Sequence, residues 1–306
     1  MSQFDVAIVG GGPAGLVAAR YCLHAKLNAA ILAPDLGGKV NYPFALRDLE
    51  PENTVWGAQI VAQFEQVIGE TQALPHFPQQ TAQITRPDDG NFELTLADGE
   101  RVTARTVIVA TGADPQRLYV EGEMKYWGHG VSFSAISHAP YFAGRDVAVV
   151  GNGRRALVAT LELAPLARRI YLIAARPQAM SEMPEAAQVR DLPNVTSFIH
   201  WEVQEVLGDE FVTGIGLVGT NGETRQLTVD GVFIQFALIP NNELVRGLVE
   251  LDHYGHICIN HRCETSLPGL FAAGDVTNIQ SEQVLVAVGE GAKAALSVWE
   301  YLATHQ

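Results

Sequence analysis

The chain has 306 residues, 47% of them hydrophobic and 18% charged, which is enough apolar material for large cores and excludes a mostly disordered chain. The 34 acidic residues outnumber the 20 Lys and Arg and give a formal net charge of −14, which disfavours nucleic acids and anionic membranes as partners. The length is that of two typical domains.

The apolar runs, the opening residues and the cysteine count indicate the cellular compartment. No apolar run approaches the roughly 18–20 residues that a membrane span needs, and the opening residues Met-Ser-Gln-Phe-Asp do not begin a signal peptide. Three cysteines, an odd and small number, disfavour a disulfide scaffold. Cys258, His261 and Cys263 lack a fourth ligand and a standard metal spacing. We expect a cytoplasmic protein without a membrane span or a metal site.

Short apolar runs that end near glycine recur along the chain and alternate with helix-like stretches. The run 6–10 precedes the helix-like stretch 16–23, and the run 147–151 precedes another at 154–161. Such continuous runs are typical of strands buried on both faces of a parallel sheet. Further runs occupy residues 29–33, 107–111, 170–174, 232–236 and 270–274. The alternation predicts an α/β fold.

The same order of elements occurs twice. Each unit has a strand, a helix, a second strand, a hairpin and a closing strand, and the hairpin turns are Asp98-Gly99 and Asn221-Gly222. Both dipeptides favour two-residue turns, because their residues tolerate positive φ. The repeat predicts two dinucleotide-binding, Rossmann-like domains, each with three layers.

The first glycine loop, 10–15, has the pattern G-x-G-x-x-G between a strand and a helix. Gly10 allows the tight turn, Gly12 lets the backbone approach a pyrophosphate, and Gly15 lets the helix pack on the strand. The helix N-terminus adds N–H donors for phosphate. The usual acidic ribose ligand is absent at Ala33, so Asp35 is either a ribose partner or an ordinary loop aspartate.

The second glycine loop, 151–156, has the form G-x-G-x-x-A after a strand. Arg154 and Arg155 add positive charge at the start of the next helix, which suits a pyrophosphate. Two arginines here are equally consistent with solvation or with pairing to nearby acids.

Four motifs stand in one order: the loop 10–15, Leu36-Gly37-Gly38-Lys39, Val109-Ala110-Thr111-Gly112-Ala113, and residues 268–275, which read PGLFAAGD. Over nearly its whole length the chain resembles the low-molecular-weight thioredoxin reductase family of FAD-dependent pyridine nucleotide–disulfide oxidoreductases. Residues 283–291 also resemble the last helix of the related alkyl hydroperoxide reductase flavoprotein.

The resemblance implies a homodimer whose FAD domain comprises 1–115 plus 246–306, with an inserted domain over 118–243 for NAD(P)H or an altered nucleotide. It assigns Asp275 to the flavin ribityl chain and directs the helix that begins at Gln283–Val284 toward the flavin. Tyr42 and Phe44 are expected near the flavin ring, either stacked on it or simply packed. The implied FAD-binding residues are Gly10, Gly12, Pro13, Ala14, Gly15, Gly38, Lys39, Ala110, Thr111, Gly112, Gly274, Asp275, Gln283 and Val284.

The chain departs from the family where the redox chemistry is expected. Ser134 and Ser137 replace the two cysteines, and His138 stands where the family has an acidic residue. Serine forms no disulfide, so ordinary NADPH–thioredoxin reductase activity is not expected. The replacement is either an engineered double change or natural divergence, and the altered neighbours favour divergence. His138 is a candidate proton donor or a plain surface histidine.

The second nucleotide site is also altered. Of the arginine cluster that grips the NADPH 2′-phosphate in the family, only Arg176 remains. The implied residues of this site are Gly151, Gly153, Arg154, Arg155 and Arg176. The site then takes NADH, takes NADPH weakly, or holds a second FAD.

Three functions follow from these observations. The first is an FAD-dependent oxidoreductase that passes electrons through flavin without a protein dithiol, as a ferredoxin–NADP reductase-like or diflavin variant with ferredoxin or another small protein as partner. The second is a non-catalytic flavin-binding protein or redox sensor on the same fold. The third is a disulfide reductase that uses the non-standard cysteines Cys258 and Cys263, or a partner's cysteines.

Overall fold

The computed structural model describes residues 2–42, 44–52, 58–71, 74–87, 90–177, 180–279 and 281–305. The chain divides into two compact units. Unit 1 comprises Met1–Asn41, Trp56–Asp114 and Ile239–Gln306, and unit 2 comprises Tyr42–Val55 and Pro115–Leu238. The strands β9 (Ala113–Pro115) and β18 (Leu238–Pro240), which pair with each other, carry the chain from one unit to the other.

Unit 1 is built on a seven-stranded sheet in the order β5-β2-β1-β8-β7-β6, with β19 paired to β8. The strands β5, β2, β1, β8 and β19 run parallel, whereas β7 is antiparallel to both β8 and β6. The strands are β1 (Ser2–Val9), β2 (Ala29–Leu32), β5 (His76–Phe77), β6 (Thr81–Thr85), β7 (Phe92–Leu96), β8 (Arg101–Val109) and β19 (Leu270–Ala272).

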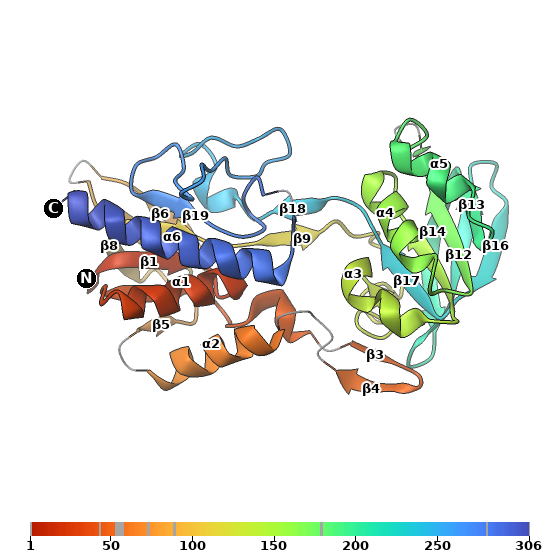
Figure 1. The fold of residues 1–306 in the computed structure, drawn as a ribbon, viewed down its shortest axis with the longest axis horizontal. Coiled ribbons are helices and arrows are strands. Elements are labelled where there is room, and N and C mark those ends of the chain that lie inside the picture. Colours follow the sequence, from red (N-terminus) through yellow and green to blue (C-terminus); the bar gives the residue numbers. More distant parts are fainter. Residues whose placement is uncertain are drawn as a thin grey trace. The chain divides into compact units, whose positions relative to one another are not determined.

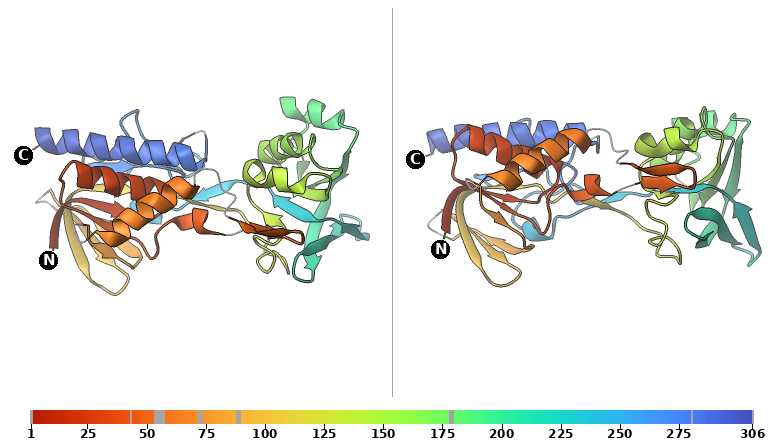
Figure 2. Two further views of the ribbon diagram at one scale, coloured as in Figure 1. Left: turned by 60° about the horizontal axis from the view of Figure 1, so that its bottom comes forward. Right: turned by 90° about the horizontal axis from the view of Figure 1, so that it is seen from below.

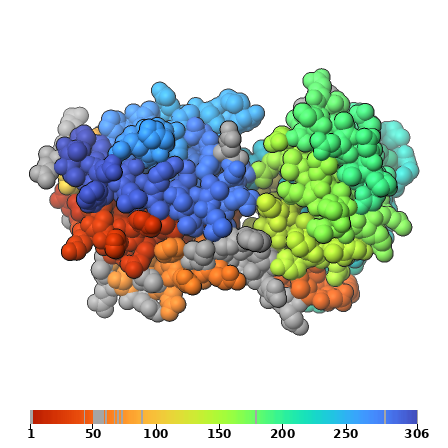
Figure 3. All heavy atoms as spheres, in the orientation of Figure 1, coloured from red at the N-terminus to blue at the C-terminus, as the bar shows by residue number. Residues whose placement is uncertain are grey.

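Helices α1 (Pro13–His24), α2 (Ala58–Glu70) and α6 (Val284–Thr304) accompany this sheet, and α1 packs against both other helices (Figures 1 and 2). Two glycines let the backbone segments around α1 approach closely. A Cβ on Gly15 would lie 1.9 Å from the carbonyl oxygen of Gly10, and one on Gly291 would lie 2.1 Å from that of Ala14. The outer face of α6 (dark blue in Figure 3) stays exposed and carries Leu296 and Trp299.

Unit 2 contains an all-parallel sheet in the order β10-β17-β11-β12-β13 and an antiparallel sheet β14-β15-β16. Apolar clusters cover both faces of the parallel sheet. The strands of the two sheets are β10 (Val131–Ser132), β11 (Asp146–Val150), β12 (Arg169–Ala174), β13 (Val195–Ile199), β14 (Trp201–Gly208), β15 (Val212–Gly219), β16 (Thr224–Thr228) and β17 (Gly231–Ile234). The helices of unit 2 are α3 (Ala135–His138), α4 (Arg154–Leu163) and α5 (Pro184–Arg190).

A hairpin from early in the chain completes unit 2. It consists of β3 (Phe44–Leu46) and β4 (Leu49–Glu52). The buried Phe44 ring stacks on His138 with centroids 4.1 Å apart, and Tyr42 packs on Trp127 at 4.6 Å. The N–H of Ala45 donates to the carbonyl oxygen of Gly128 over 2.7 Å. Residues 42–52 therefore lie with the second unit, outside the range 118–243 expected from the sequence, and both aromatic rings have partners there.

Three short 3-10 helices complete the described elements: η1 (Gly38–Asn41), η2 (Ala139–Phe142) and η4 (Glu243–Val245). Of the helices in the described part of the chain, none combines the length and the apolar character that a membrane crossing demands.

Candidate functional site

The loop 10–15 of unit 1 has the geometry of a phosphate-binding turn. Gly10 has φ +116°, and a Cβ there would lie 2.2 Å from the carbonyl oxygen of Ala110, so the turn admits only glycine. Around Gly12, in contrast, no described atom lies within 4 Å of the position that a Cβ would take. No side chain among the described residues caps α1, which begins with Pro13. Its free N–H groups therefore face an open approach.

Segments distant in sequence converge on this loop. A Cβ on Gly38 would lie 3.1 Å from Cα of Gly12, and one on Gly274 would lie 3.1 Å from Cβ of Ala14. Gly274 also neighbours Ala287, in the first turn of α6, at 3.6 Å. The helix start at Gln283–Val284 therefore lies one turn from the Gly274 turn.

Lys39 links the segment after Gly38 to Ala113 and to Asp275. Its Nζ donates to the carbonyl oxygen of Ala113 over 2.6 Å and to Oδ2 of Asp275 over 3.0 Å. Thr111 exchanges hydrogen bonds of 2.6 and 3.1 Å with Asn241, and Gly112 turns with φ +72°. The structure thus gathers the residues singled out at 10–15, 38–39, 110–112 and 274–275 at one end of the unit 1 sheet.

Sequence reasoning missed Glu290, which fixes the Gly274 turn. This carboxylate is buried in α6 and accepts from the N–H of Gly274 over 3.2 Å and from Oγ1 of Thr277 over 3.3 Å. Lys293 lies 3.3 Å from its other oxygen. The available signal was an acidic residue between Gly289 and Gly291 in the apolar first half of the helix, but Gly274 and Thr277, whose groups it binds, lie in another segment.

The second glycine loop joins β11 to α4 in unit 2, as the first loop joins β1 to α1 in unit 1. A Cβ on Gly151 would lie 2.4 Å from the carbonyl oxygen of Gln235, whereas no described atom lies within 4 Å of one on Gly153. Arg154 bonds Glu185 over 2.7 Å, and Glu185 has a lowered pKa because of its own backbone N–H and then Arg154. The N–H of Arg176 donates to Oδ1 of Asn152 over 3.0 Å, which brings the end of β12 to the loop.

Arg154 therefore pairs with a nearby acid, which is one of the two alternatives that the sequence left open. Arg155 is partly buried. Gly151, Gly153, Arg154 and Arg176 all lie around the start of α4. No side chain of the described residues caps this helix, so its first N–H groups are open to an anion.

Ser134 and Ser137 meet as the cysteines of a redox motif would. The Oγ of Ser134 donates to the Oγ of Ser137 over 3.0 Å. Ser132, which is buried, accepts from the N–H of Ser134 over 3.0 Å and lies 2.7 Å from Nδ1 of His138. The two serines stand three residues apart, as the cysteines of a Cys-x-x-Cys motif do, and their hydroxyls form no disulfide.

Burial lowers the pKa of His138 from 6.5 to about 4. Its ring also stacks on Phe44 and pairs with Ser132. With this lowered pKa the imidazole is neutral at pH 7.

The cysteines are unsuited to dithiol chemistry. Burial raises the pKa of Cys22 and of Cys263 to about 12, and burial and then Asp252 raise that of Cys258. Their thiols stay protonated at neutral pH, which argues against the disulfide reductase that would use Cys258 and Cys263. Within the described residues, no group of three or more His, Cys, Asp or Glu side chains could hold a metal ion.

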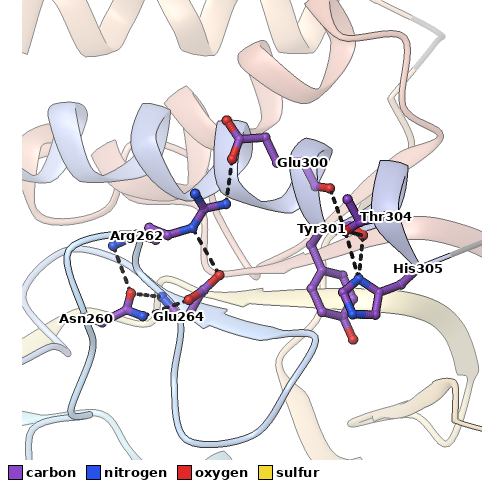
Figure 4. A network of polar contacts seen from close by, with 7 residues as sticks. All are labelled: Asn260, Arg262, Glu264, Glu300, Tyr301, Thr304 and His305. Atoms are coloured by element: carbon purple, nitrogen blue, oxygen red, sulfur yellow. Dashed lines mark hydrogen bonds and ion pairs between the residues drawn. The ribbon is translucent and has the colours of Figure 1, made fainter.

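Cys263 belongs instead to a turn that docks on α6. The residue adopts φ +62°, and its Sγ lies 3.7 Å from the carbonyl oxygen of Glu290. Arg262 pairs with both Glu264 and Glu300, as Figure 4 shows. These contacts give Cys263 a structural role.

Two Rossmann-like units with glycine loops define a protein with two dinucleotide-binding folds. The family description "Pyridine nucleotide-disulphide oxidoreductase" matches residues 4–291, and the chain belongs to this family. It is 34% identical over 302 residues to an alkyl hydroperoxide reductase component from Pseudomonas putida, and 33% identical over 300 residues to NADH dehydrogenase from Bacillus subtilis. In each case the match covers 98% of this chain and 58% of the relative.

Solved structures agree with the fold expected from the sequence. Thioredoxin reductase from Streptococcus pyogenes superposes with a TM-score of 0.88 at 27% identity, covering 99% of each chain. Thioredoxin reductase from Giardia duodenalis gives a TM-score of 0.85 at 25% identity, covering 99% of this chain and 100% of the other. The resemblance to thioredoxin reductases and the two-unit α/β fold are both confirmed.

Membership of this family implies the use of FAD and a nicotinamide nucleotide. The donor set of unit 1 fits FAD: an uncapped helix start and an open backbone at Gly12 suit a diphosphate, and Asp275 offers an acceptor for a hydroxyl-bearing chain. The uncapped α4 and the open Gly153 fit a second diphosphate in unit 2.

Proposed function

We propose that the protein is an FAD-dependent oxidoreductase that accepts reducing equivalents from a nicotinamide nucleotide and passes them to an external acceptor without a dithiol of this chain. The observation that carries the proposal is the Ser134–Ser137 pair, whose hydroxyls meet over 3.0 Å where the family has cysteines. The raised pKa values of Cys22 and Cys263, to about 12, support it.

Unit 1 supplies the FAD site. FAD, when bound, accepts a hydride and passes its electrons on. The N–H groups at the start of α1 hold the diphosphate, and the open backbone of Gly12 lets it approach. Asp275 accepts from the ribityl hydroxyls, and Lys39 holds the Asp275 carboxylate from the other side. Pro13, Ala14, Gly15, Gly38, Ala110, Thr111 and Gly112 shape the rest of the site, and the helix start at Gln283–Val284 faces the flavin.

Unit 2 supplies the site of the electron-donating nucleotide. The start of α4 at Gly153, with Arg154 and Arg155, would hold its diphosphate, and Arg176 would be available to its adenosine ribose. The pairing of Arg154 with Glu185 leaves less positive charge for a 2′-phosphate, which favours NADH. The relative named NADH dehydrogenase supports the same choice.

The proposal extends to the setting of the protein. We place it in the cytoplasm, because its three cysteines are all free thiols, as in a reducing compartment. We place it there as a homodimer on the resemblance to thioredoxin reductases. Its acceptor is a small redox protein such as a ferredoxin or a small molecule.

An anaerobic titration tests this function. Acid release should yield one FAD per chain, and NADH should bleach the flavin absorbance within seconds. Two FAD per chain would replace the nicotinamide site by a second flavin site. Flavin that dithionite bleaches and neither NADH nor NADPH bleaches would overturn the enzyme and favour a non-catalytic flavoprotein.

A further inference from the structure

Gln235 follows β17 and lies beside the glycine loop of unit 2. Its N–H donates to the carbonyl oxygen of Val150 over 2.7 Å, which extends the pairing of β17 with β11. Its own carbonyl oxygen is 2.4 Å from the position that a Cβ on Gly151 would take. The residue is therefore adjacent to the loop that opens α4.

The side chain of Gln235 belongs to the α4 face of the sheet. Residues two apart in an extended strand share a face. Phe233 belongs to the apolar cluster that also contains Ala135 of α3 and Leu157 of α4, whereas Ile234 belongs to the cluster on the opposite face. Gln235 thus points to the side on which α4 begins.

The sheet order makes this edge a ligand-binding crevice. From β11 the chain passes through α4 to β12 on one side, whereas β17 lies on the other side of β11. The carboxyl ends of β11 and β17 flank the point at which the strand order reverses, where open α/β sheets bind their ligands.

The amide of Gln235 is buried without a partner. The residue is 5% exposed, and within the part of the chain that the structure describes its Nε2 has no hydrogen-bond partner. Buried donors are nearly always satisfied, because leaving one unpaired is costly. An unpaired amide beside an uncapped helix start calls for an acceptor on a ligand.

We propose that Gln235 is a nucleotide-binding residue whose side-chain amide donates to the nicotinamide half of the bound nucleotide. This inference rests on the proposed function of unit 2. The adenosine ribose of a Rossmann ligand lies at the end of the second strand, which is β12 here. Because β17 is on the opposite side of β11, it receives the other half of the dinucleotide.

The variant Gln235→Met keeps the size of the side chain and removes the unpaired donor. We expect the Kd for NADH, from isothermal titration calorimetry on the full chain, to rise about three- to tenfold. The Kd for ADP-ribose, which lacks nicotinamide, should stay within about twofold. The thermal midpoint without nucleotide should rise by about 1–3 °C, because the variant relieves an unsatisfied group.

In Gln235→Met, weaker NADH binding together with a higher thermal midpoint separates a role in binding from a role in stability. Thr81 is the matched control, because its buried Oγ1 also lacks a hydrogen-bond partner among the described residues, and it lies in β6 of unit 1. Thr81→Val should raise the thermal midpoint and leave the Kd for NADH unchanged.

A lower thermal midpoint or an unchanged Kd for NADH in Gln235→Met would overturn the role of Gln235 alone. An equal loss for NADH and ADP-ribose would overturn the assignment to the nicotinamide half. A wild-type protein that binds neither ligand would overturn the function of unit 2 and this inference with it.

Discussion

The two glycine loops share a backbone design and differ in chemistry. In unit 1 the third motif position is Gly15, where a Cβ would lie 1.9 Å from the carbonyl oxygen of Gly10. In unit 2 that position is Ala156, whose Cβ would lie 2.9 Å from a Cβ on Gly151. The first loop is uncharged, whereas the second has Arg154 and Arg155 at the helix start. The two loops therefore share a backbone geometry and differ in charge.

The two units also differ in where they keep sulfur. All three cysteines lie in unit 1, and unit 2 has two serines at the redox positions. Cys22 and Cys263 are buried and their thiols have raised pKa values, whereas Cys258 is partly exposed. The difference teaches that the thiols of unit 1 and the Ser134–Ser137 pair of unit 2 occupy separate parts of the chain.

To test the comparison of the two loops, the largest expected change in ligand affinity is that of Gly12→Asp. Gly12 has φ −73°, and the space around a Cβ there is open, so the variant should fold. Its carboxylate would face the FAD diphosphate, and like charges at contact cost several kcal/mol. We expect FAD affinity to fall by roughly 100-fold or more, measured as flavin absorbance per chain. Full flavin content in this variant would refute the phosphate role of the first loop.

The same substitution at the matched position of unit 2, Gly153→Asp, should act on the other ligand. Gly153 has φ −151° and open surroundings. We expect normal flavin content and a loss of NADH affinity of about tenfold, smaller than at Gly12 because two arginines partly offset the added charge. Loss of flavin here, with NADH binding intact, would break the assignment of the two ligands to the two units.

His138 gives unit 2 a pH dependence of stability. Its pKa falls from 6.5 to about 4 on folding, so its contribution is present above pH 6.5 and is lost as the pH falls from there toward 4. Because the ring is partly exposed, we expect a loss of about 1–2 kcal/mol between pH 7.5 and pH 5. His138→Gln should lack this part of the dependence in urea unfolding, and equal slopes for both proteins would contradict the burial of the ring.

The smallest effect expected is that of alkylation. With a pKa of about 12 for Cys22 and Cys263, only about one thiol in 10,000 is ionised at pH 8. Iodoacetamide on the native protein should therefore modify Cys258 at most and leave electron transfer from NADH to ferricyanide unchanged. Inactivation in step with labelling, followed by mass spectrometry, would bring a cysteine back into the chemistry of unit 1.

Local patterns determined the fold class and both glycine loops. A strand, a glycine turn and a helix are contiguous, so the residues 10–15 and 151–156 themselves specify the open positions at Gly12 and Gly153. The Ser134–Ser137 pair was equally visible in the sequence, because the two residues are three positions apart.

Only the tertiary structure decided which distant groups meet. Lys39 pairs with Asp275, 236 residues later, and no periodicity encodes such a contact. The buried Phe44 ring packs with the second unit, where His138 stacks on it 94 residues further along the chain. The unpaired amide of Gln235 was likewise invisible in the sequence, because satisfaction of a polar group depends on every atom packed around it, and packing is set by the whole fold.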